Sequence, residues 1–204
     1  MQKILDDYEE ESTYVVKEYP TFQITEEMRK LAKKNKYEEV GKLRGNPDYI
    51  LPTSRFFQGN GKNQTQNVIG NLGDMTFQLY LRKRAIQFTR DGLYLHQGDC
   101  FDYKIDEKLY DVKTGQMKEN GTIYDLPPNY QFFIAEQQIN KEIDYYIHIQ
   151  VNSELTKAYL IGYISREDAL KNPIEQRENM CNPAVCIPFS QLKPVGELFN
   201  SEIG

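Results

Sequence analysis

The chain has 204 residues, of which 39% are hydrophobic and 27% are charged, with 15 tyrosines, 10 phenylalanines and no tryptophan. This composition is typical of a globular protein with enough apolar material for one core, and the length fits a single domain. A formal net charge of −5 excludes nucleic-acid binding by bulk positive charge, so such a function would need a local basic patch or bound cations.

The sequence favours a cytoplasmic protein. It holds no run of about 18 apolar residues, so we expect no membrane span. Residues 1–12 lack the apolar core and the small-residue cleavage site of a secretion signal. The three cysteines, an odd number, give no disulfide framework and indicate a reducing compartment.

Residues 1–67 are expected to form a helical arm. Residues 1–20 are acidic and then aromatic, which favours an arm or an edge strand. Thr25 is a plausible N-cap for a helix that extends to Arg44, where Gly45-Asn46-Pro47 ends it. The amide-rich residues 45–67 are expected to form a long loop, and loops of that length in a compact domain tend to be functional or mobile.

A second helix is expected from about Asn67 to Arg84. Its apolar residues fall towards one side, Asp74 lies in its second turn, and its basic end suits a helix C-terminus. The period then changes to two, which predicts short strands, followed by a short helix that Ser165 and Asp168 cap. The predicted strands are Leu93–Gln97, Cys100–Ile105, Lys108–Thr114, Asp144–Val151, Ala158–Ile164 and, in a tail that is otherwise loop, Val185–Phe189. The sum is one α/β domain with a core at about 68–170, the arm 1–67 and a C-terminal extension 171–204.

The stretch from Gly98 to Gly115 carries the clearest chemistry. If Asp106-Glu107 forms the turn of a hairpin, Asp102 lies opposite Asp111, and directly paired residues share a face of the sheet. Lys113 lies two residues beyond Asp111 and projects from that same face. The register therefore predicts two carboxylates with Cβ atoms about 5 Å apart and an ammonium group alongside.

Two carboxylates placed opposite each other repel, and a divalent cation offsets that repulsion. Mg²⁺ takes one or two protein carboxylates, keeps several waters and completes its shell with substrate phosphate. A lysine beside such a centre can orient or deprotonate the attacking water and hold the scissile phosphate, while the metal stabilises the developing charge. The alternative is a solvent-facing hairpin with ordinary surface charges, because a lone D-x-K motif recurs often.

The order of these residues resembles the PD-(D/E)xK nuclease superfamily, which includes many restriction enzymes and phage or repair nucleases. Its members often place an acidic residue on a helix, a second on one strand and (D/E)-x-K on the next. Asp74, Asp102 and Asp111-Val112-Lys113 follow that order, and Asp144-Tyr145-Tyr146-Ile147 and Ile161-Gly162-Tyr163-Ile164 resemble later strands of the family. The resemblance covers about residues 68–170. Asp74 replaces the commoner Glu, and Phe101 stands where proline is usual.

The resemblance implies a restriction-endonuclease-like core, with a central mixed β-sheet flanked by helices. It also implies a Mg²⁺-dependent DNA endonuclease in which Mn²⁺ can substitute, with Asp102, Asp111 and Asp74 as metal ligands and Lys113 as the fourth catalytic residue. Asp74 has a shorter reach than Glu, so binding through water, or no binding, stays open. A homodimer is expected, because cutting both strands of a duplex is simplest with two sites. If the protein is a nuclease, the polar stretch before the Asp74 helix is placed to contact phosphates or base edges through Arg55, Lys62, Gln64 and Asn67.

Several alternatives stay open. A non-catalytic protein of the same fold, such as an inhibitor or an assembly subunit, could use its acidic surface to bind a basic partner, and it would tolerate changes at Asp111 and Lys113. Nothing in the sequence separates DNA from RNA, or endonuclease from exonuclease action. Asp99 is a second candidate for the strand acid. A structural metal held by Cys181 and Cys186 with Cys100 and His96 is disfavoured by the wide C-x4-C spacing, and His148 is expected to be a packing residue.

Overall fold

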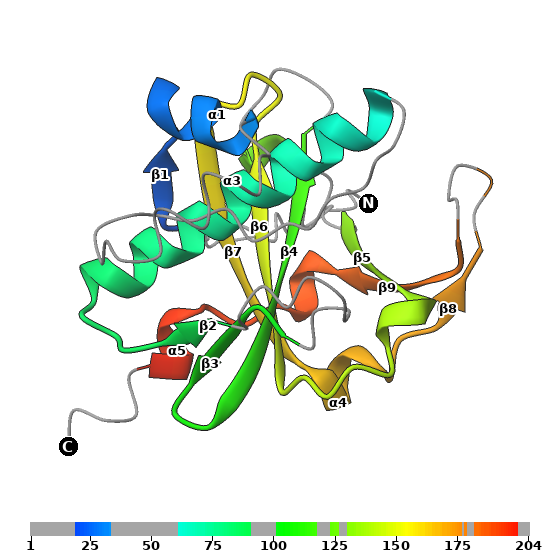
Figure 1. Cartoon of the computed structure of the whole chain (residues 1–204). Helices are drawn as coiled ribbons and strands as arrows, with labels where there is room; N and C mark the ends of the chain where they lie inside the picture. The colour runs from blue at the N-terminus through cyan, green and yellow to red at the C-terminus, as the bar shows by residue number, and fades with distance from the viewer. Residues whose placement is uncertain are drawn as a thin grey trace, which may run out of the picture.

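The computed structural model describes residues 19–33, 61–90, 101–117, 123–126, 130–176, 178 and 182–199, and in the second of these ranges it describes side chains from Val68 onward. These residues form two sheets and a long helix (Figure 1). The six-stranded sheet has the order β1-β7-β6-β4-β3-β2, and the three-stranded sheet has the order β5-β9-β8.

The six-stranded sheet is mixed, as predicted. Strands β4 and β6 are parallel, and every other neighbouring pair is antiparallel. The α/β class is therefore confirmed. The strands of this sheet are β1 (Thr21–Gln23), β2 (Thr89–Arg90), β3 (Tyr103–Ile105), β4 (Lys108–Gln116), β6 (Tyr145–Val151) and β7 (Lys157–Ser165).

The long helix α3 (Gly61–Lys83) crosses one face of this sheet (Figure 1). It approaches the sheet closely at Gly73, where an added Cβ would lie 1.8 Å from Oγ1 of Thr114 on β4. Only glycine fits between helix and strand there. The shorter helix α1 (Glu26–Lys33) packs against α3, while α4 (Arg166–Ala169) follows β7 and α5 (Gly196–Phe199) lies at the C-terminal end of the described chain.

The sheet separates two hydrophobic clusters, one on each face. The cluster under α3 includes Leu72, Phe77, Tyr103, Ile147 and Ile149. The opposite cluster includes Phe132, Tyr146, Ile161, Val185 and Ile187, and it lies between the large sheet and the three-stranded one. Strand β6 is thus buried on both faces, since its alternate residues belong to different clusters.

Several local predictions are confirmed. The hairpin pairs Tyr103 with Tyr110, and its two turn residues have φ angles of 46° and 62°, which suit a two-residue hairpin turn. The backbone N–H of Met28 donates to Thr25 Oγ1 at 3.2 Å, so Thr25 caps α1. Ser165 caps α4, because its Oγ accepts from the backbone N–H of Asp168 at 3.1 Å.

The predicted loop at 45–67 is wrong over residues 61–67, because α3 begins at Gly61 rather than near Asn67. Amides and glycine suggested a loop by composition, yet this stretch contains no proline, and tertiary packing of α3 outweighs weak propensities. Residues 34–60 and 91–100 lie outside the described residues, and with them the predicted end of the first helix and the predicted strand Leu93–Gln97.

The C-terminal tail contains more structure than the predicted loop with one strand. The strand expected at 185–189 is β9 (Ala184–Pro188), and β8 (Ile174–Glu175) and β5 (Gln131–Ala135) pair with it on either side. At the other end of the chain, β1 pairs with β7 as an edge strand. Both sheets therefore use residues beyond the predicted core of 68–170.

Among the helices that the structure describes, none has both the length and the apolar character needed to cross a bilayer.

Candidate active site

Asp102 directly precedes β3, at the point where the hairpin ladder becomes irregular. Its backbone N–H donates to Tyr110 O at 2.9 Å, one residue out of the hairpin register. Its carboxylate Oδ2 accepts the backbone N–H of Val112 at 2.6 Å, so the side chain replaces a backbone acceptor. Asp102 is thereby held against β4, in a partly buried position.

Asp111 and Lys113 both lie on β4 and point away from α3. Successive side chains of a strand point to opposite faces of the sheet. Thr114 packs against Gly73 of the helix, so Asp111 and Lys113, which alternate with it, lie on the other face. Asp111 is only 2% exposed, and the Lys113 ammonium forms an ion pair with its Oδ2. Strand alternation predicts Asp111 and Lys113 on one face, and the structure confirms it. The predicted direct pairing of Asp102 with Asp111 is wrong, because the ladder ends at Tyr103 and Tyr110 and Asp102 instead bonds Tyr110 O and the Val112 N–H. The chemical role of the three residues stays a prediction.

A second lysine, Lys141, reaches the same carboxylate from a different part of the chain. It follows the 3-10 turn η2 (Glu136–Gln138), and its Nζ lies 3.3 Å from Asp111 Oδ1. Sequence reasoning missed this residue, because a single lysine in a polar turn thirty positions from Asp111 carries no periodic or motif signal. Each oxygen of Asp111 thus contacts one ammonium group.

The electrostatics confirm that these groups are neighbours. Burial, and then the negative charge of Asp111, raise the pKa of Asp102 to about 7, against the opposing effect of Lys113. Burial and Asp111 also raise the pKa of the Tyr146 hydroxyl to about 12. Tyr146 is the residue of β6 that pairs with Asp111, so it lines the same face of the sheet.

Asp74 lies on α3, on the opposite side of the sheet from Asp111. Its Oδ1 accepts the Tyr103 hydroxyl, and its Oδ2 accepts Arg90 Nη2 at 2.9 Å and Gln78 Nε2 at 3.1 Å. Through its contact with Tyr103, Asp74 lies near the start of β3. Its negative charge also raises the pKa of Asp102, after the larger effects of burial and Asp111. These contacts tie Asp74 into the fold, and its predicted role as a metal ligand stays a prediction.

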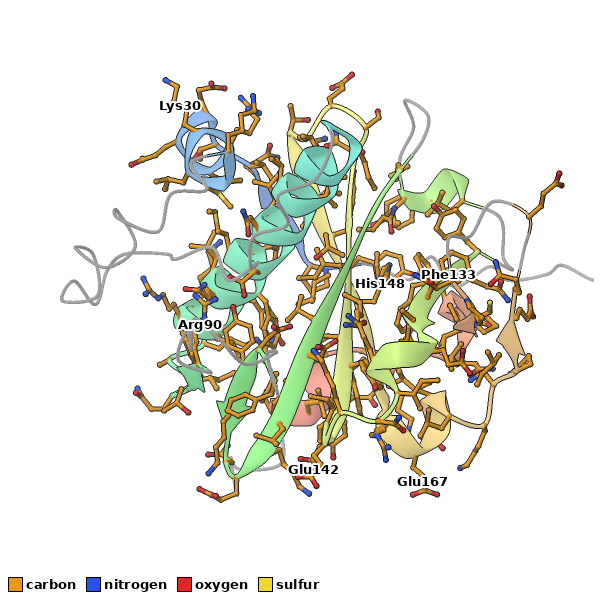
Figure 2. All side chains as sticks on the ribbon, turned by 45° about the vertical axis from the view of Figure 1, so that its right-hand side comes forward. Lys30, Arg90, Phe133, Glu142, His148 and Glu167 are labelled. Atoms are coloured by element: carbon orange, nitrogen blue, oxygen red, sulfur yellow. The ribbon has the colours of Figure 1, made fainter. Side chains whose placement is uncertain are left out.

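The floor of the site is formed by β6, where His148 pairs with Lys113 in parallel register. His148 is 2% exposed, stacks on Phe132 at 4.6 Å between ring centroids, and contacts Gln150 Oε1 through Nε2 at 3.1 Å. Burial lowers its pKa to about 4, so it is neutral at physiological pH. The expected packing role is confirmed, and Figure 2 shows His148 and Arg90 on opposite sides of β4.

The predicted substrate-binding residues are placed only in part. Lys62, Gln64 and Asn67 lie in the first turns of α3, where the structure describes the backbone alone. Arg55 lies outside the described residues, as do Asp99 and the suggested zinc ligands His96, Cys100 and Cys181. Cys186 is buried on β9.

The donor set fits a hard divalent cation. Among the described residues no group of three or more His, Cys, Asp or Glu side chains is gathered as a metal cluster. Mg²⁺, however, needs only one or two carboxylates, because waters and substrate oxygens complete its shell. Asp102 and Asp111 supply two, and the buried Oδ2 of Asp111 accepts no hydrogen bond in the described structure beyond its ion pair with Lys113.

Comparison of the chain with protein-family models, curated proteins and solved structures finds no match in any of the three. Function is therefore inferred from the chemistry of the residues around Asp111.

Proposed function

We propose that this protein is a Mg²⁺-dependent nuclease of the PD-(D/E)xK type that hydrolyses phosphodiester bonds of DNA on a restriction-endonuclease-like core. The observation that carries the proposal is the buried Asp111 of β4. It forms an ion pair with Lys113 of the same strand, and its charge acts on Asp102, which directly precedes the neighbouring strand β3. The parallel β4–β6 pair and the helix α3 across one face of the sheet are compatible with that core.

The state of the two carboxylates favours a site for a cation over an ordinary hairpin. A buried carboxylate is costly unless donors or counter-charges serve both of its oxygens. Asp111 has ammonium groups but no regular hydrogen bond on Oδ2, and burial, followed by the charge of Asp111, raises the pKa of Asp102 to about 7. Perturbed carboxylates of this kind gather at functional sites, because the ligand that relieves the repulsion is the one the site binds.

Asp102 and Asp111 are the residues that would hold Mg²⁺, or Mn²⁺ in its place. The bound cation supplies a Lewis acid for a phosphoryl oxygen and lowers the pKa of a bound water. In the overall reaction, water adds to phosphorus, one P–O bond to a sugar oxygen breaks, and that oxygen takes a proton.

Lys113 is the residue placed to act on the reacting groups. Its side chain is 17% exposed, so its ammonium can reach solvent while it remains paired with Asp111. From there Nζ can hydrogen-bond the attacking water or a non-bridging phosphate oxygen. A neutral residue at this position would leave the carboxylates but remove that contact.

Asp74 and Tyr103 position the strand acid. Tyr103 immediately follows Asp102, and its hydroxyl donates to Asp74 on α3. Arg90 of β2 donates to the same carboxylate, so helix, hairpin and edge strand meet at one buried group. This arrangement fixes the start of β3 and therefore the backbone of Asp102. We assign Asp74 as a positioning residue in the proposed reaction.

A substrate survey tests the proposed function. Wild type, Asp111→Ala and Lys113→Ala are incubated with supercoiled plasmid, linear duplex, single-stranded DNA and RNA in Mg²⁺, Mn²⁺ or EDTA. We expect wild type to cut DNA only with a cation, and both variants to lose the activity. Cleavage confined to RNA would replace the substrate class. No cleavage by wild type, or equal cleavage by all three proteins, would overturn the proposal and favour a non-catalytic binding protein.

A further inference from the structure

We propose that Lys141 is a second cationic residue of the active site. It screens Asp111 while no divalent cation is bound, and it binds the substrate phosphate once a cation has taken its place. The inference rests on the proposed function, because it concerns how that site binds its cation and substrate. Its evidence is separate, since it comes from a segment that the nuclease resemblance does not assign.

The first observation is the division of Asp111 between two lysines. Lys113 Nζ pairs with Oδ2, whereas Lys141 Nζ lies 3.3 Å from Oδ1 and forms a hydrogen bond with it. A divalent cation that bound Asp111 through Oδ1 would occupy the space and the lone pair that Lys141 uses. Cation and ammonium therefore compete for one oxygen.

The second observation is that the backbone of Lys141 is held by hydrogen bonds while its side chain is partly exposed. Its carbonyl accepts the N–H of the buried Ile143 at 3.0 Å, and its own N–H donates to Gln138 O at 3.2 Å. Arg166 at the start of α4 donates to Ile139 O at 2.9 Å and holds the preceding residues. The side chain of Lys141 remains 23% exposed, so its flexible four-carbon stem can move the ammonium from Asp111 to a nearby anion.

The third observation is the charge of the group as a whole. Asp102 and Asp111 are balanced by Lys113 and Lys141, so the group carries no excess of negative charge when both acids are ionised. A divalent cation would leave an excess of positive charge, which an anionic phosphodiester offsets. The neighbouring Glu142 is exposed and lies at the lower edge of the molecule in Figure 2, and among the described residues the acidic contact that the structure gives Lys141 is Asp111.

The inference predicts that one substitution changes the affinity for a cation and the affinity for DNA in opposite directions. Lys141→Gln removes the competitor of the cation, so Mn²⁺ should bind the DNA-free protein about 3- to 10-fold more tightly, the size of a partly exposed ion pair. The same variant loses a phosphate contact, so it should bind a short DNA duplex in Ca²⁺ several-fold more weakly and with a shallower salt dependence. A purely structural role of Lys141 would weaken both.

The experiment measures free Mn²⁺ by electron paramagnetic resonance during titration of the full chain, followed by duplex binding in Ca²⁺. Lys141→Arg, which keeps the charge, should stay near wild type in both measurements and guards against a folding defect. Lys171→Gln is the matched control, since Lys171 pairs with Asp168 at 2.7 Å on the surface and should change neither.

Unchanged or weaker Mn²⁺ binding by Lys141→Gln would overturn the screening role, and unchanged duplex binding would overturn the phosphate role. If wild type itself binds no Mn²⁺ and cuts no DNA, the proposed function fails and this inference with it. If wild type binds and cuts but the variant shows neither shift, only the assignment of Lys141 fails.

Discussion

The buried carboxylates on the two faces of the six-stranded sheet have different kinds of partners. Under α3, Asp74 accepts hydrogen bonds from Tyr103, Arg90 and Gln78, so both of its oxygens have firm donors. On the other face, Asp111 contacts two lysine ammonium groups, and its charge raises the pKa of a neighbouring acid. The first arrangement stabilises the fold, whereas the second leaves electrostatic repulsion for a ligand to relieve.

Strand β4 contributes side chains to both faces of the sheet. Thr114 packs directly against Gly73 of α3, with no room for a larger side chain between helix and strand. Asp111 and Lys113 point to the opposite face from Thr114. Their backbone is held within β4 by its pairing with β6. A site built on a packed strand keeps its geometry better than one on a loop, which suits a reaction that depends on positioning.

The largest effect is expected at Lys113. Lys113→Ala should lower the cleavage rate by about 10²- to 10⁴-fold, the range for losing a group that acts on a proton in the transition state. Stability should also fall, because the buried Oδ2 of Asp111 loses its counter-charge while Lys141 contacts only Oδ1, so the rates are compared for protein that urea unfolding shows to be folded. Steady-state kinetics are compared with Lys108→Ala, whose ammonium pairs with Asp144 on the surface at 2.9 Å. Equal rates for the two variants would remove Lys113 from the chemistry.

The next effect is on stability and belongs to the α3 face. Asp74→Ala should lower the free energy of unfolding by about 3 kcal/mol. It removes the ion pair of Asp74 with the partly buried Arg90 and the acceptor of the Tyr103 hydroxyl. Urea unfolding measures the loss. Adding Arg90→Leu should recover part of it, since the charge that Asp74 balanced is then gone. A loss below about 0.5 kcal/mol would place Asp74 outside the structural network.

The third effect is a pH dependence from His148. Its pKa in the folded protein is about 4, below the ordinary value, so unfolding takes up a proton between about pH 6.5 and 4. The stability that neutral His148 gives is present above about pH 6.5 and falls with pH, by about 2 to 3 kcal/mol at pH 4. His148→Phe keeps a ring against Phe132 and should remove that fall in urea unfolding at pH 7 and 4.5. An unchanged pH dependence would contradict the burial of a neutral imidazole.

The smallest effect has the opposite sign and comes from Asp102. Its pKa in the folded protein is raised to about 7, so the folded state keeps a proton that the unfolded chain loses near pH 4. Its contribution to stability is therefore present at low pH and lost as the pH rises through 7. This pKa difference corresponds to at most about 4 kcal/mol, and solvent screening of the partly exposed carboxylate reduces it, so in EDTA Asp102→Asn should be about 1 to 2 kcal/mol more stable than wild type at pH 8 and about equal to it at pH 4. A variant that is less stable at pH 8 would show that Asp102 is not under repulsion.

The hairpin could be predicted from sequence because its pairing is local. Two turn residues set the register as far as Tyr103 and Tyr110, and the alternation of strand residues then places Asp111 and Lys113 on one face. The irregular contacts that hold Asp102 beside them could not be predicted. Lys141 and Arg90 could not be predicted, since each reaches the site through long-range packing that no spacing encodes. The three-stranded sheet was missed for the same reason, as β5 and β9 pair across about fifty residues of chain. The start of α3 was placed late because amides resemble a loop by composition while a packed helix tolerates them.

The most direct test of the central claim is the rate of plasmid cleavage by wild type and Asp111→Asn over a range of Mg²⁺ concentrations. The substitution keeps the shape of the side chain. It removes repulsion from Asp102 but also the ion pairs with Lys113 and Lys141, so urea unfolding is used first to show that the variant is folded. We predict that wild-type cleavage saturates with Mg²⁺ and is absent in EDTA, and that the variant is slower by on the order of a thousandfold. Equal rates for the two folded proteins, or cleavage that persists in EDTA, would contradict a cation-dependent site at Asp111.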